Sequence, residues 1–226
     1  MLKFLKKVPL LKPLSDTDLK AIAKISHVRE YGPGESIFQQ FAPATHLFVV
    51  LEGRVKIFAR SGGKKRKTFA YLRAGDFFGE MALLEKKPRS AAAEAVEFTK
   101  LLIVENKDFQ RLITKNNALA LALLRTVSER LRRADEQIEA LLFSNILGRV
   151  AKTLYDLGRR GDKRGATITL PERYTQQELA DLVGTTREPL TRAISTLRRA
   201  QVVELRDERY IIKDTSKLEA ICFMQP

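Results

Sequence analysis

The spacing of hydrophobic and polar residues changes twice along the chain, and each change predicts a different kind of structure. A short amphipathic segment is followed, from Val28 onward, by short β-rich runs. From Lys107 to about Phe143 the spacing is helical, and near Ser144 a third pattern begins with its own apolar periodicity. The chain is therefore expected to hold a β-rich unit, a long helix and a second, mostly helical unit.

The β-rich region begins after a capped helix. Ser15 is a candidate N-cap and Asp18 stands at the capping-box position, before a short helix that ends near Ser26. Short strands are predicted at Leu47–Leu51, Arg54–Ala59, Thr68–Leu72 and Leu101–Val104. Strands at such spacing, with glycine turns and no helix between them, predict an antiparallel sandwich or roll. The basic run Lys64–Lys67 falls at a hairpin tip, where a solvated loop is favoured over a binding patch.

One apolar stripe on the predicted long helix repeats with the alternating 4–3 spacing of a two-helix seam. Its members are Ala120, Leu124, Val127, Leu131, Ala134, Ile138 and Leu141. The stripe is narrow and flanked by charges, whereas a helix buried on its own domain usually has a broader apolar face. We expect a parallel homodimer seam, with packing on the helix's own domain as the alternative.

A glycine-rich turn with a following arginine predicts a phosphate site. Gly79 permits a tight turn, a short helix can begin at Glu80, Met81 and Ala82, and Arg89 with Ser90 returns on the next strand. A carboxylate beside a phosphate is repulsive unless it binds something else, and a ribose hydroxyl is the obvious partner for Glu80. The alternative is a plain strand–turn–strand with a surface arginine.

The last third of the chain predicts a helix to Leu157, a charged loop over Gly158–Gly165, then two helices joined by a turn and a terminal hairpin. Thr175 caps the first of the two helices with Glu178, and Gly184 allows the left-handed turn that ends it.

The second of these helices begins after Thr186, its predicted N-cap, with Pro189 in the first turn. Its outer, N-terminal end carries Arg187, Glu188, Thr191 and Arg192. A helix-turn-helix places this end in the major groove, where arginine reads guanine and glutamate accepts from cytosine. A helical hairpin that binds another protein is the alternative.

Composition limits the remaining possibilities. The 226 residues are 44% hydrophobic and 30% charged, as in globular proteins of one or two domains. The longest apolar run, Ala118–Leu124, is too short to cross a bilayer, and Lys and Pro interrupt the N-terminal segment before it could act as a signal peptide. Cys222 is the sole cysteine, which excludes internal disulfides and Cys-ligated clusters. We expect a cytoplasmic protein without a membrane partner.

The net charge of +14 points to a polyanionic partner, but its distribution is misleading. Residues 1–144 contain 26 Lys/Arg and 16 Asp/Glu, whereas residues 145–226 contain 15 and 11. The part predicted to read DNA is thus the less basic one.

The chain combines the phosphate-site pattern and the helix-turn-helix pattern in this order, joined by the heptad helix. In this combination it resembles the Crp/Fnr family of bacterial transcription regulators. The likeness spans nearly the whole chain and is strongest at Phe78–Leu83 with Arg89–Ala91, and at Val183–Glu188 with Arg192. It implies an α+β fold: an N-terminal antiparallel, jelly-roll-like β-roll that binds a cyclic nucleotide (1–107), a long dimerisation helix (108–144) and a C-terminal winged helix-turn-helix (145–226).

The resemblance also implies residue roles. The ligand residues would be Gly79, Glu80, Met81, Ala82, Arg89 and Ser90, with Arg130 closing over the pocket from the long helix. Arg187, Glu188 and Arg192 match the base-reading trio, Gln177 and Thr186 match phosphate contacts, and Thr191 lies on the same surface. The implied partners are double-stranded DNA close to the palindrome TGTGA-N6-TCACA, a second copy of the chain, and RNA polymerase.

One departure from the family pattern leaves open which nucleobase the ligand carries. Where members that bind cAMP usually place a threonine followed by a small polar residue, this chain has Ala134 and Asp135. Ala134 offers adenine no hydroxyl, while Asp135 can accept two hydrogen bonds from the edge of guanine. The expected ligand is cAMP first, then cGMP or cyclic di-GMP. Asp135 could instead form an ion pair with Arg132 or Arg133.

Two other function classes compete with a ligand-gated regulator. A dimer that binds DNA constitutively, with a vestigial sensor or one for a different ligand, would also explain the departure at Ala134. An enzyme of the same small-barrel shape would need a metal triad, and the chain has only His27 and His46, without a His-x-His pair. We expect no metal and no catalytic residues.

Overall fold

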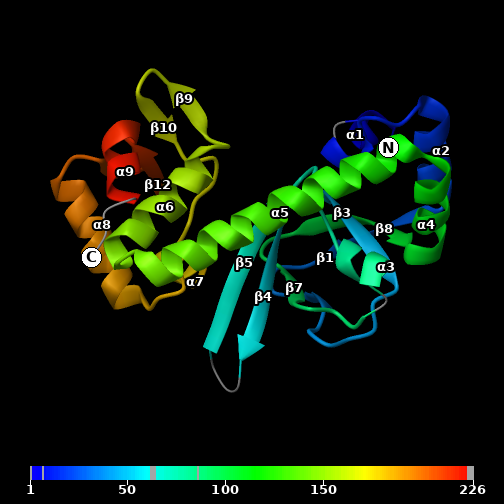
Figure 1. The fold of residues 1–226 in the computed structure, drawn as a ribbon, viewed down its shortest axis with the longest axis horizontal. Coiled ribbons are helices and arrows are strands. Elements are labelled where there is room, and N and C mark those ends of the chain that lie inside the picture. The colour runs from blue at the N-terminus through cyan, green and yellow to red at the C-terminus, as the bar shows by residue number, and fades with distance from the viewer. Residues whose placement is uncertain (1, 7, 62–64, 86, 223–226) are drawn as a thin grey trace. The chain divides into compact units, whose positions relative to one another are not determined.

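The computed structural model describes residues 2–6, 8–61, 65–85 and 87–222 (Figure 1). It divides into two compact units, residues 1–131 and 132–226. In the described part, no helix is both long and apolar enough to cross a membrane. Lys64 of the basic hairpin run and the glycines before it lie outside the described residues. The predicted domain boundaries at residues 107 and 144 stay a prediction.

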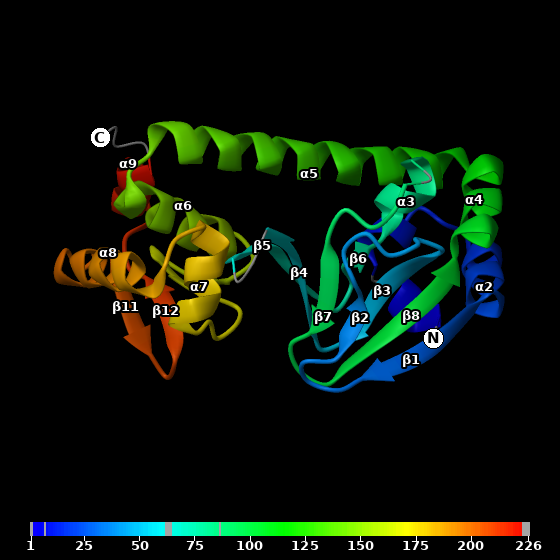
Figure 2. The same cartoon turned by 90° about the horizontal axis from the view of Figure 1, so that it is seen from below.

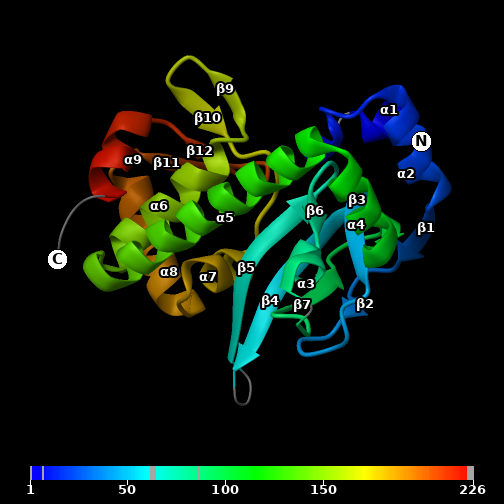
Figure 3. The same ribbon diagram turned by 45° about the vertical axis from the view of Figure 1, so that its right-hand side comes forward.

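The first unit is built on two four-stranded antiparallel sheets, as predicted. The first sheet has the order β1 (Ser26–Tyr31), β8 (Thr99–Glu105), β3 (His46–Glu52), β6 (Phe77–Phe78). The second has the order β2 (Ser36–Phe38), β7 (Ala92–Ala95), β4 (Arg54–Ser61), β5 (Lys65–Arg73). Figure 3 shows β4 and β5 as a long hairpin at the edge of this second sheet.

Strand β3 is buried on both faces, which explains its unbroken apolar run. Successive side chains of a strand point to opposite faces. Leu47 and Val49 accordingly lie in a core shared with the N-terminal helices, whereas Phe48 and Val50 lie in the core between the sheets. The four predicted strands are all present.

The N-terminal helices cover one face of the first sheet. They are α1 (Leu2–Leu5), the 3-10 helix η1 (Pro9–Leu11) and α2 (Asp16–Lys24). The capping box is confirmed, because the Ser15 side chain accepts from the backbone N–H of Asp18 and the Asp18 side chain accepts from that of Ser15. Helix α2 ends slightly earlier than predicted, since Ser26 already belongs to β1.

The prediction of one unbroken helix after Lys107 is wrong. The structure has two helices, α4 (Asn106–Lys115) and α5 (Asn117–Phe143), and Asn116 between them is extended, with φ −136° and ψ 96°. The Asn116 side chain accepts from the backbone N–H of Leu119 at 3.0 Å and donates to Asp18 at 3.1 Å. Asparagine favours such caps over helix interiors. Figure 2 shows α2 and α4 side by side at this point.

Helix α5 carries buried apolar residues beside exposed ones. Leu119 and Leu123 are buried in the core of the first unit, and Val127 of the heptad stripe packs against the same core. The heptad stripe contains the exposed residues Leu124, Leu131 and Ile138, at 61%, 62% and 56% exposure. The stripe is therefore largely open in the single chain; the side chain of its last member, Leu141, lies outside the described part.

The second unit is a helical domain with a small antiparallel sheet. Its elements are α6 (Ile146–Gly158), β9 (Asp162–Arg164), β10 (Thr167–Thr169), α7 (Gln176–Val183), α8 (Arg187–Arg199), β11 (Val203–Arg206), β12 (Arg209–Ile212) and α9 (Thr215–Cys222). The sheet order is β11-β12-β10-β9. The predicted charged loop thus contains β9, whose three exposed residues carry no apolar alternation. Helix α9 was not predicted either.

Cys222 ends α9 and is buried. Its thiol donates to the carbonyl oxygen of Leu218 at 3.2 Å, and burial raises the pKa of the thiol to about 11. Within the described range it is a packing residue of the second unit.

Candidate functional site

The tight turn predicted at Gly79 is present in the first unit, and its geometry requires a glycine. Gly79 has φ +88° and leads from β6 into α3 (Glu80–Glu85). A Cβ at this position would lie 2.7 Å from Nη1 of Arg89 and 3.0 Å from the carbonyl oxygen of His46. Both the backbone angle and the close approach exclude a side chain here. The short helix begins at Glu80 as predicted; the side chain of Ala82 lies outside the described part.

Arg89 is buried at the centre of this turn, with 5% of its surface exposed. Its Nη1 donates to the carbonyl oxygen of Gly79 at 3.2 Å, and its Nη2 donates to that of His46 at 2.8 Å. The guanidinium lies 4.2 Å from the ring centre of Phe38 and 5.5 Å from that of Phe48. Arg89 is therefore not the surface arginine of the alternative interpretation.

The environment of Arg89 fits an anion. Its Nε atom is buried and has no hydrogen-bond partner among the described groups. Burial lowers the pKa of the guanidinium, and the nearby Glu80 carboxylate opposes this shift. A buried cation with an unused donor is stabilised by an additional negative charge.

Glu80 and Arg130 join the turn to the long helix. Glu80 is 4% exposed, and its Oε1 accepts from Nη1 of Arg130 at 2.5 Å. Nη2 of Arg130 donates to the carbonyl oxygen of Phe77, also at 2.5 Å. The structure thus brings Arg130 to the predicted site, in agreement with the position that the resemblance implied. The residue pattern alone did not indicate this ion pair.

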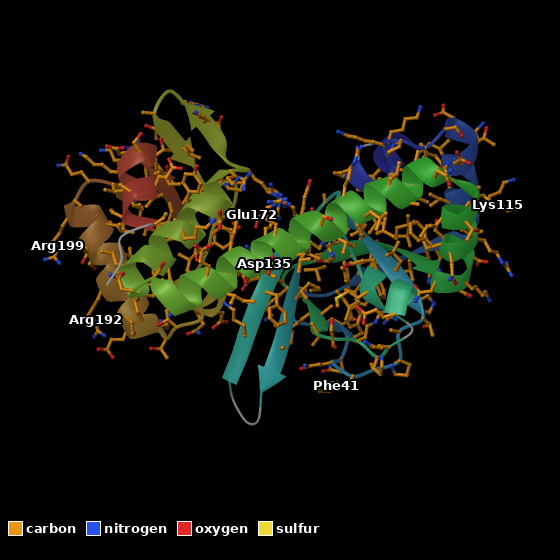
Figure 4. All side chains as sticks on the ribbon, viewed as in Figure 1. Phe41, Lys115, Asp135, Glu172, Arg192 and Arg199 are labelled. Atoms are coloured by element: carbon orange, nitrogen blue, oxygen red, sulfur yellow. The ribbon has the colours of Figure 1, made fainter. Side chains whose placement is uncertain are left out.

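Ser90 and Met81 lie at the exposed side of the turn. The Ser90 hydroxyl is 3.5 Å from the Met81 sulfur, and Gln40 donates to the Ser90 carbonyl oxygen at 3.3 Å. Arg89 and Ser90 precede β7 and do not lie within it, which corrects the predicted strand. Instead, the backbone carbonyl oxygen of Arg89 accepts from the backbone N–H of Phe41 at 2.9 Å. Phe41 is an exposed residue with φ +68° and is labelled in Figure 4.

Ala134 and Asp135 lie on the part of α5 that belongs to the second unit. Both are exposed, and Figure 4 shows Asp135 on the helix surface. Among the described residues Asp135 forms no ion pair, so the expected alternative pairing with Arg132 or Arg133 is wrong. The role of these two positions toward a nucleobase stays a prediction.

The two histidines lie on different strands of the first unit, His27 on β1 and His46 on β3. His46 lies beside Thr45, with 2.8 Å between Oγ1 and Nδ1, and burial lowers the pKa of its imidazole. In the described part of the chain, no three His, Cys, Asp or Glu side chains are placed to share a metal ion.

In the helix-turn-helix of the second unit, both helices begin after their predicted N-cap residues and the first helix ends at its predicted glycine. Thr175 and Glu178 form the capping box of α7, with distances of 3.2 Å and 2.8 Å. Gly184 ends the helix in the left-handed conformation, with φ +78° and ψ 45°. Thr186 is the N-cap of α8, although its side chain makes no capping hydrogen bond. The local signals therefore predicted both ends of the turn.

Helix α8 separates an apolar face from a polar one. Leu190, Ile194 and Leu197 are buried, as predicted. The predicted DNA-facing residues are all exposed: Gln177, Thr186, Arg187, Glu188, Thr191 and Arg192. Figure 4 shows Arg192 and Arg199 extending outward from this helix.

Hydrogen bonds order this exposed surface. Glu188 and Arg192 form an ion pair one turn apart. Gln177 donates to Asp181 at 2.8 Å, and Thr191 donates to Gln176 at 3.2 Å. The last contact joins α8 to α7.

Arg149 on α6 supports the turn and was missed by the sequence analysis. Its Nη2 donates to the carbonyl oxygen of Gly184 at 3.0 Å and lies 3.5 Å from that of Val183. These carbonyls belong to the end of α7, where backbone acceptors lack helical partners. No local signal marks Arg149, because its partners lie more than thirty residues further along the chain.

Comparisons with known proteins cover both units. Residues 28–116 match the family model of the cyclic nucleotide-binding domain, and residues 148–221 match that of the Crp-like helix-turn-helix domain. The cyclic AMP receptor protein of Thermus thermophilus is 34% identical over 215 residues, which cover 95% of this chain and 97% of that protein.

Solved structures share the fold. A mutant of CooA from Carboxydothermus hydrogenoformans aligns with a TM-score of 0.78 at 23% identity, covering 89% of each chain. The c-di-GMP responsive regulator CLP of Xanthomonas campestris aligns with a TM-score of 0.74 at 24% identity, covering 88% of this chain and 99% of that one. The chain belongs to the Crp/Fnr family of transcription regulators, with a cyclic nucleotide-binding domain and a DNA-binding helix-turn-helix domain.

Proposed function

We propose that this protein is a homodimeric, sequence-specific transcription regulator whose DNA binding is controlled by a cyclic nucleotide held at Gly79, Glu80 and Arg89. The observation that carries the proposal is the burial of Glu80 and Arg89 next to Gly79, with Arg130 of α5 bonded to Glu80. A ligand that engages Glu80 thereby acts on the residue that ties the β-roll to the long helix.

The cyclic phosphate would bind to Arg89 and to the first backbone N–H groups of α3. These groups belong to Glu80, Met81 and Ala82, and they point away from the helix toward its N-terminal end. Ser90 would add a hydroxyl donor at the exposed side. Glu80 would accept from the ribose 2′-hydroxyl, because an ionised carboxylate is an acceptor only.

For the base, we propose cAMP as the first candidate, with cGMP and cyclic di-GMP as the alternatives. The 34% identical relative is named as a cyclic AMP receptor protein. Ala134 and Asp135 favour the alternatives, because Asp135 could accept from N1–H and the amino group of guanine. Selective binding of one nucleotide decides between these assignments.

Two copies of the chain would pair along α5. The exposed side chains of Leu124, Leu131 and Ile138 follow the heptad spacing of a parallel coiled coil. Two α8 helices related by such a dimer would enter successive major grooves about 34–36 Å apart.

On DNA, the two recognition helices would each read one half of a TGTGA-N6-TCACA palindrome. Arg187 and Arg192 would donate to guanine and Glu188 would accept from cytosine, while Gln177 and Thr186 would bind phosphates. Thr191 would contact a thymine methyl or a phosphate from the same surface. RNA polymerase is the proposed further partner of the DNA-bound dimer.

Calorimetric titration tests the ligand site. The unaltered protein is titrated with cAMP, cGMP and cyclic di-GMP, beside Arg89→Ala and the matched control Arg111→Ala. Arg111 is an exposed arginine of the same unit that forms an ion pair with Asp108. We expect one nucleotide to bind at micromolar concentration, binding to be lost in Arg89→Ala, and the control to bind normally. Equal affinity of Arg89→Ala would contradict the site.

Fluorescence anisotropy with the palindromic duplex tests the control of DNA binding. We expect the nucleotide to change the affinity for this duplex more than for a scrambled one. Tight binding that no nucleotide changes would favour the constitutive regulator instead.

A further inference from the structure

The wing of the DNA-binding domain ends in an unusual turn. Strands β11 and β12 pair up to Arg206 and Arg209, which leaves Asp207 and Glu208 as a two-residue turn. Their φ angles are +50° and +62°. Such turns favour asparagine and glycine, because other residues are strained at positive φ. Here the turn places two carboxylates at the tip of the wing, although glycine would relieve the strain.

Glu208 forms an ion pair that leaves the wing. Its Oε2 accepts from Nη1 of Arg173 at 2.6 Å, and the two side chains are 75% and 64% exposed. A third acid of the hairpin, Glu204, pairs instead with Arg206 in the same hairpin and with Lys213, which follows it. The wing is thus joined to Arg173 by Glu208.

Arg173 lies at the N-terminal end of the first helix of the helix-turn-helix. It precedes Thr175, the N-cap of α7, by two residues. In this motif the first helix crosses the DNA backbone, and helix N-termini are favourable positions for phosphate. An arginine at this position could bind a phosphate of the DNA backbone. In the structure, however, the Glu208 carboxylate of the wing forms an ion pair with Arg173.

We propose that Arg173 is a further contact to the DNA phosphate backbone and that Glu208 restrains it. On binding, the guanidinium would exchange the Glu208 carboxylate for a phosphodiester oxygen, and Glu208 would remain close to the backbone as a repulsive charge. The acidic wing tip therefore lowers DNA affinity independently of sequence, since phosphate contacts carry no base information. This inference rests on the proposed mode of DNA binding.

The test uses full-length protein with Glu208→Gln, Arg173→Gln, the double variant and Asp207→Asn. Asp207 is the matched control, because it is an acid of the same turn and does not pair with Arg173. Affinity for the palindromic and the scrambled duplex is measured by anisotropy over a series of KCl concentrations. Circular dichroism confirms that each variant is folded.

We expect Glu208→Gln to bind both duplexes about two- to fivefold more tightly, the range that an exposed ion pair supports. Arg173→Gln should flatten the plot of log affinity against log salt by about 0.9, the slope for one lost phosphate contact. The gain in affinity from Glu208→Gln should be smaller when Arg173 is also replaced by Gln. Asp207→Asn should give a smaller gain than Glu208→Gln.

Unchanged affinity of Glu208→Gln, or an equal gain without Arg173, would overturn the restraint while leaving the regulator assignment intact. A matching gain in Asp207→Asn would also overturn it, because general repulsion would then explain the effect. If the unaltered protein binds neither duplex with any nucleotide, the proposed function fails and this inference fails with it.

Discussion

Lys152 on α6 donates from Nζ to Oε2 of Glu136 on α5 at 3.0 Å, and to Asp156 at 2.9 Å. Burial opposes the charge of Lys152, but hydrogen bonds to the two carboxylates outweigh it and raise the pKa of the ammonium. The hydrogen bond from Lys152 lowers the pKa of the Glu136 carboxyl. The pair connects the end of the long helix to the first helix of the DNA-binding domain.

Removal of the Glu136 charge should destabilise the second unit in a pH-dependent way. Because the folded pKa of Glu136 is lowered, its contribution is present above the unfolded pKa and is lost as the pH falls through the folded pKa. We expect Glu136→Gln to lower the free energy of unfolding by about 0.5 kcal/mol at neutral pH, after allowance for solvent screening. Urea unfolding between pH 7 and about pH 3 measures the difference, which should shrink toward the acidic end.

Glu139→Gln is the control for this change, since Glu139 is exposed on the same helix. A deficit of Glu136→Gln that persists unchanged in acid would show that packing, and not the ion pair, is responsible.

Replacement of Arg149 should weaken DNA binding without affecting the nucleotide site. In Arg149→Met the carbonyl oxygens of Val183 and Gly184 lose their charged donor. We expect a loss of about 1–2 kcal/mol in the free energy of unfolding and weaker binding to the palindromic duplex. Nucleotide affinity, measured by calorimetry, should match that of the unaltered protein. Normal DNA affinity in this variant would mean that the turn keeps its geometry without Arg149.

A pair of glycine substitutions separates crowding from backbone strain. Gly79→Ala would place a Cβ 2.7 Å from Nη1 of Arg89, whereas at Gly34, with φ +78°, a Cβ meets nothing within 4 Å. Both variants should lose about 1 kcal/mol of stability from strain at positive φ. Only Gly79→Ala should lose nucleotide binding, by tenfold or more in a calorimetric titration. Equal nucleotide affinity of the two variants would show that Arg89 can move aside.

Charge introduced into the heptad stripe should abolish the dimer while sparing the fold. Leu131 is 62% exposed and lies in the stripe, whereas Leu121 is 54% exposed and lies outside it. We expect Leu131→Glu to sediment as a monomer and Leu121→Glu to remain dimeric, with thermal unfolding of the first unit unchanged in both. A dimeric Leu131→Glu would place the interface elsewhere.

Elements with local signals were predictable from the sequence. The capping boxes at Ser15 and Thr175 and the left-handed turn at Gly184 depend on residues within one helical turn, and the structure confirms them. The break at Asn116 was missed because the apolar residues on both sides remain helical in spacing, while the cap is fixed partly by the distant Asp18. Strand β9 was missed because all of its residues are exposed.

The candidate site was predictable in its chemistry but not in its surroundings. Gly79 and Arg89 lie close in sequence, so their pattern indicated a phosphate site. The aromatic contacts of Arg89 come from Phe38 and Phe48, which belong to different sheets. Strand pairing brings these segments together, and no periodicity along the chain encodes it.

The buried thiol of Cys222 makes the chain suitable for chemical labelling. With a pKa of about 11, roughly one thiol in ten thousand is ionised at pH 7, and the thiolate is the form that reacts with maleimides. A cysteine introduced at an exposed position outside the heptad stripe, such as Glu139, would then carry the only probe on each copy. Spectroscopic distances between two such probes would follow the separation of the α5 helices as a nucleotide is added.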